Sequence, residues 1–183
     1  MRIATWNVNS LKARLDKVLW WLERARPDVL LMQETKLAWF DRLARWLTDA
    51  ADPAEPLLLG GDFNVAPEDI DVWDPRACHG GTHVSPPERQ AFGRLRTWGL
   101  ADAYRLHHAE PGRYTWWDYR AGNFHKNFGM RIDHLLVTES VAARTVWAEI
   151  DREARKGKPI PSDHAPLAID LDQPGHAFNP GWK

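Results

Sequence analysis

The sequence has little cysteine, little net charge and no long apolar run. Its one cysteine, Cys78, rules out an intramolecular disulfide bond and suits a reducing compartment. The formal net charge of -1 rules out a global basic field, so a nucleic acid would have to be met by a local basic patch or through a metal ion. No stretch approaches the length of a membrane span, and the N-terminus MRIATWNVNS lacks the apolar segment of a signal peptide. We therefore expect no membrane contact and a cytoplasmic location.

The remaining composition is that of a folded globular protein. The chain has 183 residues, of which 44% are hydrophobic, enough for one domain with a core. We find no internal repeat and no interdomain linker. We therefore expect a single domain over residues 1–172, followed by a tail at residues 173–183, QPGHAFNPGWK, whose composition indicates fraying.

The hydrophobic pattern predicts strands that alternate with helices. Apolar residues recur at helical spacing over residues 11–26, between the strand-like runs RIATWNV and VLLMQE, and such a strand–helix–strand unit makes the two strands parallel. A second helix is predicted over residues 37–47. A third should run from Ser85-Pro-Pro-Glu88, a strong helix start, to about Trp98, with Gly99 as its stop. Later strands are expected in LLLGG, RIDHLLVT, VWAEIDRE and PLAIDL.

Polar residues gather where the predicted strands end, which is where open α/β sheets bind ligands. Carboxylate and amide oxygens suit Mg²⁺ or Mn²⁺, and a histidine beside an aspartate can stabilise developing charge. The sequence has no serine nucleophile elbow, no cysteine–histidine zinc spacing and no glycine-rich phosphate loop, so metal-assisted hydrolysis of a phosphoester is the leading interpretation. The five clusters are Asn7, Glu34, Asp62 with Asn64, Asp133, and Asp163 with His164.

Each cluster also has a purely structural interpretation. Asn7 could cap a turn, and Glu34 could favour the start of the helix that follows it. Gly-Asp-Phe-Asn could form an Asx turn, and Asp163 could cap a short turn. Coincidence at all five strand ends is a poor explanation, so we retain the metal site.

Residues 113–131 form a loop rich in aromatic and basic side chains, RYTWWDYRAGNFHKNFGMR. Aromatic side chains that wedge or stack, and cations that hold phosphates, are the means by which proteins bind distorted DNA. The alternative is a packed surface loop. The residues expected to contact DNA are Trp116, Trp117, Tyr119, Arg120 and Arg131.

Seven motifs, in order along the chain, resemble the exonuclease III family, the bacterial branch of the endonuclease/exonuclease/phosphatase superfamily. They are MRIATWNVNSLKARL, PDVLLMQETK, LLLGGDFNVAPEDIDV, SPPER, YTWWDYR, GMRIDHLLVT and PSDHAPL. Gly-Asp-Phe-Asn and Ser-Asp-His mark only the superfamily, whereas SPPER followed by TWWDYR and RIDH points to the DNA-repair branch.

The resemblance implies a fold and an activity. The fold would be α/β (α+β), a four-layer sandwich of two packed β-sheets flanked by helices. The activity would be that of a DNA-repair phosphodiesterase, an abasic-site endonuclease and 3′→5′ exonuclease on duplex DNA. Its substrates would be abasic sites and 3′ ends, and its cofactor Mg²⁺ or Mn²⁺.

The resemblance also implies roles for individual residues. Glu34 matches the principal metal carboxylate, and Asp62 the aspartate that handles the proton of the attacking water or the leaving oxygen. His164 would contact the scissile phosphate, and Asp133 would orient that histidine. The implied catalytic residues are Asp62, Asn64, Asp133 and His164, and the implied metal site consists of Asn7, Glu34, Asp62, Asn64, Asp163 and His164.

The stretch QETKLAWF, residues 33–40, departs from this family. The family has several more strands at this point, whereas here only 28 residues (62 − 34) separate Glu34 from Asp62. A long internal section is therefore missing after Lys36. The family's strand-end tyrosine is lost with it, and no residue here matches that tyrosine. We expect the first sheet to be incomplete and the runs VLLM and LLLGG to lie at open edges.

The missing section leaves alternatives to a compact working enzyme. The chain could be a folded but catalytically impaired relative that at most binds DNA or metal, or the product of a deletion or gene-model error. It could also be another phosphoesterase of the superfamily, acting on a phospholipid or an inositol phosphate, although TWWDYR argues against that. A monomer is expected, with an edge-mediated dimer as the alternative.

Overall fold

Two β-sheets form the centre of the molecule. The computed structural model describes residues 1–8, 11–31, 37–158 and 160–182, with only the backbone described at residues 11–13, 15 and 37–39. The strands are β1 (Arg2–Thr5), β2 (Val29–Leu31), β3 (Leu58–Asp62), β4 (Ala101–Asp102), β5 (Asp133–Val137), β6 (Thr145–Ile150) and β7 (Leu167–Leu171). The strand order is β2-β1-β7-β6 in the first sheet and β3-β5-β4 in the second. β1 and β2 are parallel, as the strand–helix–strand pattern predicts, and the other pairs are antiparallel.

Helices connect these strands, and the predicted ones are present. The helix start at Ser85 is confirmed, because the Glu88 carboxylate accepts a hydrogen bond from the Ser85 backbone N at 2.9 Å. Gly99 ends this helix with φ 129°, a conformation that favours glycine. None of the helices in the described residues combines the length and the apolar character that a membrane crossing requires. The helices are α1 (Leu11–Ala25), α2 (Leu37–Ala50), α3 (Pro75–Cys78), α4 (Pro86–Trp98), α5 (Asn123–Lys126) and α6 (Glu139–Ala142), with 3-10 turns at Asp69–Asp71, Arg120–Gly122 and Arg152–Arg155.

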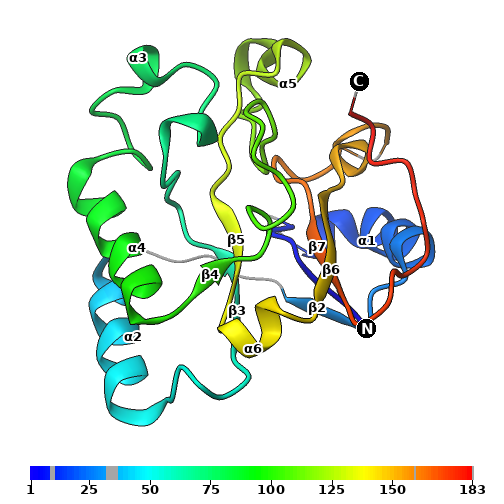
Figure 1. Cartoon of the computed structure of the whole chain (residues 1–183). Coiled ribbons are helices and arrows are strands. Elements are labelled where there is room, and N and C mark those ends of the chain that lie inside the picture. The colour runs from blue at the N-terminus through cyan, green and yellow to red at the C-terminus, as the bar shows by residue number, and fades with distance from the viewer. Residues whose placement is uncertain (9–10, 32–36, 159, 183) are drawn as a thin grey trace.

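Alternating strand residues separate the layers of the fold. In β5, Leu135 and Val137 pack between the two sheets, whereas Leu136 packs in the cluster of α2 and α4. β7 alternates in the same way, with Ala168 in the cluster that contains α1. Figure 1 shows α1 on one side of the sheets and α2 with α4 on the other. The predicted four-layer sandwich is therefore confirmed.

The two strands that flank the joint, β2 and β3, each lie at the edge of a sheet. They face one another across the sandwich, since a Cβ added at Gly60 in β3 would lie 2.6 Å from Leu31 Cδ1 in β2. In the described part of the chain no further strand pairs with either outer edge. The predicted open edges are thus present, and Leu30 and Leu58 are only half-buried.

The C-terminal tail packs along the domain, so the expected fraying is wrong. Trp182 Nε1 donates to the Ile150 carbonyl at 2.7 Å, and the Phe178 ring lies 5.7 Å from the Trp147 ring. These partners are distant in sequence, and the local composition of the tail therefore could not reveal them.

Candidate active site

Polar side chains from four strands meet where the two sheets pack together. β3 and β5 pair in a register that sets Asp62, the last residue of β3, opposite Asp133, the first residue of β5. Asn7 follows β1 and His164 precedes β7, and β1 pairs with β7. The two sheets therefore bring residues from both ends of the chain to one place.

These four side chains form a connected polar cluster. His164 Nδ1 is hydrogen-bonded to Asp133 Oδ2 at 2.8 Å, and its Nε2 lies 3.8 Å from Asp62 Oδ2. Asn7 Nδ2 donates to the same Asp62 oxygen at 3.0 Å. Asp62, Asp133 and His164 are all buried. The expected contact between Asp133 and His164 is therefore present, and Asp62 faces the other side of the imidazole.

The turn after β3 holds the Asp62 carboxylate. Asn64 N donates to Asp62 Oδ1 at 2.8 Å, and Asn64 has φ 54°, which asparagine tolerates better than most residues. This is the Asx turn that competed with a functional interpretation of Gly-Asp-Phe-Asn, and here the turn serves the site. His83 Nδ1 donates to the Asn64 carbonyl at 2.8 Å, a contact that no motif in the sequence indicated.

Two hydroxyl side chains that the sequence reasoning missed fix the backbone of the site. Thr115 Oγ1 accepts from the backbone N of Asp133 at 3.0 Å. Ser162 Oγ donates to the Asn7 carbonyl at 2.5 Å and accepts from the His164 backbone N at 3.1 Å. Thr115 lies within the motif YTWWDYR and Ser162 within PSDHAPL. Their place in these motifs was the only feature of the sequence that could have indicated them.

Burial and neighbouring charges shift the protonation of the cluster. Burial alone would lower the pKa of His164, but the carboxylates of Asp133 and Asp62 raise this pKa to about 9. Burial, and then the charge of Asp133, raises the pKa of Asp62 to about 7, against the opposing effect of His164. At neutral pH the His164 ring is therefore a cationic donor, and Asp62 titrates close to neutrality.

The cluster fits a hard divalent cation. One ligand atom each from Asp62, Asp133 and His164 lies within 4.8 Å of the others. Asp133 Oδ1 is buried and has no hydrogen-bond partner among the described residues, a capacity that a cation could satisfy. Asp163 lies at the edge of the cluster, where its Oδ2 accepts from Trp116 Nε1 at 3.1 Å. Glu34, the expected principal metal carboxylate, lies outside the described residues.

The predicted DNA contacts divide into surface and buried residues. The Tyr119 residue is 45% exposed and the Arg120 side chain 87% exposed, and Trp116 is partly exposed at the edge of the site. Trp117 and Arg131 are 0% and 1% exposed. These two have no surface to offer to DNA, so their prediction as DNA contacts is wrong.

The two buried residues support the site instead. The Trp117 backbone N donates to the Asp163 carbonyl at 3.0 Å. Arg131 pairs with two buried acids, through Nε to Asp71 Oδ1 at 2.8 Å and through Nη1 to Asp102 Oδ2 at 2.7 Å. Charge neutralisation inside the fold, and not phosphate binding, accounts for this arginine.

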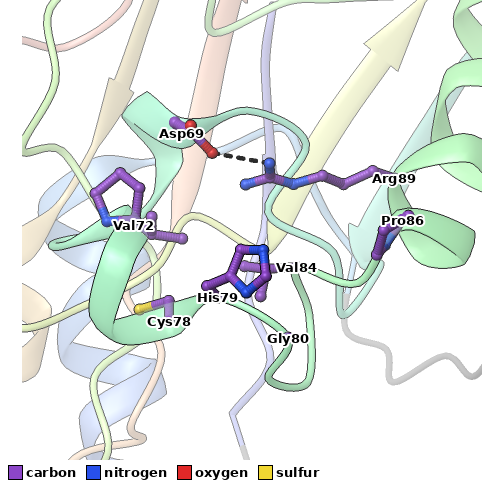
Figure 2. A pocket seen from close by; sticks show the side chains of 9 residues that line it. Asp69, Val72, Cys78, His79, Gly80, Val84, Pro86 and Arg89 are labelled. Carbon is purple, nitrogen blue, oxygen red and sulfur yellow. Dashed lines mark hydrogen bonds and ion pairs between the residues drawn. The ribbon is translucent and has the colours of Figure 1, made fainter.

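A pocket of about 530 Å³ opens beside the turn region of residues 69–89. Figure 2 shows Val72, Cys78 and Val84 around it, with Arg89 paired to Asp69 at 2.8 Å. The three apolar residues belong to the same packed cluster as Trp116. The arginine of this pocket is therefore already paired with a carboxylate, and the rest of the lining is largely apolar.

A model of the endonuclease/exonuclease/phosphatase family matches residues 4–164. The chain belongs to this family. Among curated members, it is 34% identical over 140 residues to an exodeoxyribonuclease of Bacillus subtilis, a match that covers 75% of this chain and 52% of that protein. It is 35% identical over 135 residues to exodeoxyribonuclease III of Haemophilus influenzae, covering 68% and 49%. These names agree with the resemblance to the exonuclease III branch, and the chain spans about half the length of the curated relatives it matches.

Solved structures of the family share the fold. An AP endonuclease from Archaeoglobus fulgidus matches with a TM-score of 0.88 and 26% identity, covering 94% of this chain and 100% of that one. A 3′–5′ exonuclease from Neisseria meningitidis matches with a TM-score of 0.87 and 29% identity over the same shares. The backbone of the sandwich is therefore retained in this shorter chain.

Proposed function

We propose that this chain is a DNA-repair phosphodiesterase, an abasic-site endonuclease and 3′→5′ exonuclease on duplex DNA that works by metal-assisted hydrolysis. The observation that carries the proposal is the spatial arrangement of the cluster, in which the His164 imidazole lies between the carboxylates of Asp133 and Asp62. Relatives named exodeoxyribonuclease and AP endonuclease support the choice of substrate.

The protein's own groups would move the protons. Asp133 holds the Nδ1 side of His164, which leaves Nε2 to donate to a phosphoryl oxygen as negative charge develops there. Asp62, with its pKa near 7, would take the proton of the attacking water, while the Asn7 amide fixes its carboxylate. Asn64 follows in the same turn and would orient that water.

A divalent cation would complete this chemistry by neutralising the phosphate charge and polarising its oxygens, worth several kcal/mol in the transition state. A cationic imidazole has no lone pair to give a metal, and we therefore leave His164 in the donor role. The proposed ligands of Mg²⁺ or Mn²⁺ are Asn7, Glu34, Asp62, Asn64 and Asp163, with Asp133 Oδ1, which has no hydrogen-bond partner among the described residues, as a further oxygen that a cation could use.

DNA would approach over the 113–131 loop. Trp116, Tyr119 and Arg120 are the residues of that loop that we retain as DNA contacts, because each has exposed surface. Within this proposal the protein acts as a monomer in the cytoplasm, with residues 1–172 as one catalytic domain.

One observation favours a second candidate, a catalytically impaired relative that still binds DNA. β2 and β3 are open edge strands, and Glu34 follows β2 by three residues in the sequence. The position of the metal carboxylate would then depend on the least supported strand of the first sheet.

A nicking assay separates the two candidates. The purified chain is mixed with a duplex that carries one abasic site, in Mg²⁺, in Mn²⁺ and in EDTA, beside a recessed 3′ end and an inositol phosphate as alternative substrates. We expect metal-dependent nicking that falls by roughly 10²–10⁴-fold in His164→Ala. Glu34→Ala should also abolish it, and His107→Ala, at an exposed histidine, should leave it unchanged. A cooperatively folded protein without nicking in either metal would mean that only the scaffold remains.

A further inference from the structure

A second pocket, of about 350 Å³, lies away from the catalytic cluster. Four separate parts of the chain line it: the 111–113 loop, α5 with the residue that follows it, Arg152 in the last 3-10 turn, and the tail at Gly181 and Trp182. Figure 1 shows α5 and the C-terminus at the same end of the molecule. The pocket therefore exists only because the tail packs back on the domain.

The pocket holds two arginines, Arg113 and Arg152, and Arg152 has no carboxylate partner among the described residues. The Arg152 guanidinium has no carboxylate within ion-pair distance among the described residues, and its hydrogen bond goes to the Phe124 carbonyl at 2.8 Å. Arg113 forms ion pairs with Glu110 at 3.6 Å and Glu149 at 3.9 Å, and because both distances are longer than a hydrogen bond, its N–H groups are open to a closer acceptor. Burial lowers the pKa of Arg152, with an opposing effect from Glu153, so this charge loses hydration without gaining a carboxylate within ion-pair distance.

Aromatic rings stand beside these cations. The Trp182 ring centre lies 4.8 Å from the Arg113 Cζ and 5.6 Å from the Arg152 Cζ. The Phe124 ring centre lies 4.2 Å from the Arg152 Cζ. Two guanidinium groups with open donors, next to an indole, match a ligand that carries both a phosphate and a planar base. The volume falls in the range of pockets for small organic ligands.

We propose that this pocket binds a nucleotide, with its phosphate on Arg113 and Arg152 and its base against Trp182. The ligand has two sources with the same chemistry: a free nucleoside monophosphate or the terminal nucleotide of a DNA strand. A nuclease encounters both strand ends and free nucleotides, so the choice of these two sources rests on the proposed function. The binding itself rests on the residues of the pocket.

The pocket is connected to the catalytic cluster through one residue. The Trp117 ring centre lies 5.9 Å from the Arg152 Cζ, and the Trp117 backbone N donates to the Asp163 carbonyl. A ligand that binds Arg152 in the pocket would therefore lie close to Trp117, the residue that supports Asp163, and would itself remain outside the catalytic cluster.

Calorimetric titration with thymidine 5′-monophosphate, in EDTA, tests the proposal. Thymidine and inorganic phosphate are titrated as the two halves of the ligand. We expect the monophosphate to bind more tightly than either half, and Arg152→Met to weaken it at least tenfold while its methylenes preserve the packing on Phe124. Arg113→Gln is the second variant in case Arg152→Met does not fold. Arg94→Met, at an exposed arginine paired with Asp41 on another part of the surface, should not change binding.

The outcomes are separable from those of the nicking assay. Because the titration needs no metal and no turnover, a chain that fails to nick can still bind the nucleotide, and the reverse also holds. Equal binding by Arg152→Met and Arg94→Met, or equal binding of phosphate and nucleotide, would overturn the proposal. Weakened affinity of Arg152→Met for a duplex with a free 3′ end would identify the strand end as the source, and unchanged affinity would identify the free nucleotide.

Discussion

Replacing Arg131 by methionine distinguishes a structural arginine from one that contacts DNA. Methionine keeps a long unbranched side chain and removes the guanidinium. Asp71 would keep Arg105 as a partner. Asp102 would lose its arginine partner and retain the hydrogen bond from the Tyr104 backbone N at 3.1 Å. The substitution therefore leaves a buried carboxylate without a full counter-charge.

The cost of that carboxylate sets the expected magnitude. Breaking a buried ion pair by removing one partner destabilises proteins by about 3–5 kcal/mol. A domain is stable by about 5–15 kcal/mol in total, so Arg131→Met should lose a large share of its free energy of unfolding. Arg94→Met breaks an exposed pair with Asp41 and should lose about 0–1 kcal/mol.

Chemical denaturation followed by circular dichroism at pH 7 measures both variants. Adding Asp102→Asn to Arg131→Met should recover part of the loss, because it removes the charge that was left unpaired. An Arg131→Met protein as stable as Arg94→Met that nevertheless loses affinity for duplex DNA would refute the reasoning and restore Arg131 as a DNA contact.

Two further predictions concern the same fold. Burial opposes ionisation of Asp102, but the charge of Arg131 overcomes it and holds the pKa of Asp102 well below 3.8. The stabilisation is therefore complete above the ordinary aspartate pKa of 3.8, which applies to the unfolded chain, and is lost as pH falls below it towards the folded-state pKa. Between about pH 5 and about pH 3 the wild type should lose stability more steeply than Arg131→Met in denaturation at each pH, and parallel pH profiles would count against the ion pair. In Gly60→Ala the new Cβ would lie 2.6 Å from Leu31 Cδ1, and the free energy of unfolding should fall by about 1–3 kcal/mol. Gly93→Ala in α4 meets open space and should instead gain about 0.5–1 kcal/mol, and equal effects of the two substitutions would mean that the sheets are not packed as described.

The sequence predicted the elements whose signals are local. The strand–helix–strand unit at the N-terminus and the capping of α4 by Ser85 and Glu88 depend on residues within one turn or one hydrophobic period. The strand-end polar clusters were predictable for a related reason. An acidic residue that directly follows a run of apolar strand residues lies at the end of that strand. Antiparallel pairing of β3 with β5 then sets Asp62 opposite Asp133.

The errors arose where the partner of a residue is distant. Arg131 and its partner Asp71 are 60 residues apart in the sequence. No local pattern distinguishes an arginine that forms a buried ion pair from one that is exposed and free to bind phosphate. Trp117 differs from Trp116 by one position, and alternation in an extended segment turns one ring to the core and the other to the site. Trp182 belongs to a tail whose composition resembles a disordered segment, yet its indole donates to the Ile150 carbonyl.

The same pairing logic explains how a site can survive near a joint in the chain. Asp62 and Asp133 lie on β3 and β5, which pair with each other, and β5 is held on its other side by β4. β1, which leads to Asn7, is held by β7, and β7 leads back to His164. Asp133 and His164 therefore depend on strands that are paired away from the open edges, whereas Asp62 ends the edge strand β3. Glu34 likewise follows an edge strand, β2, and both carboxylates are proposed metal ligands, so any defect caused by the missing section should fall on metal affinity first. Such a defect would appear in the nicking assay as activity restored by higher Mn²⁺ or Mg²⁺, whereas damage to the Asp133–His164 pair could not be relieved by metal.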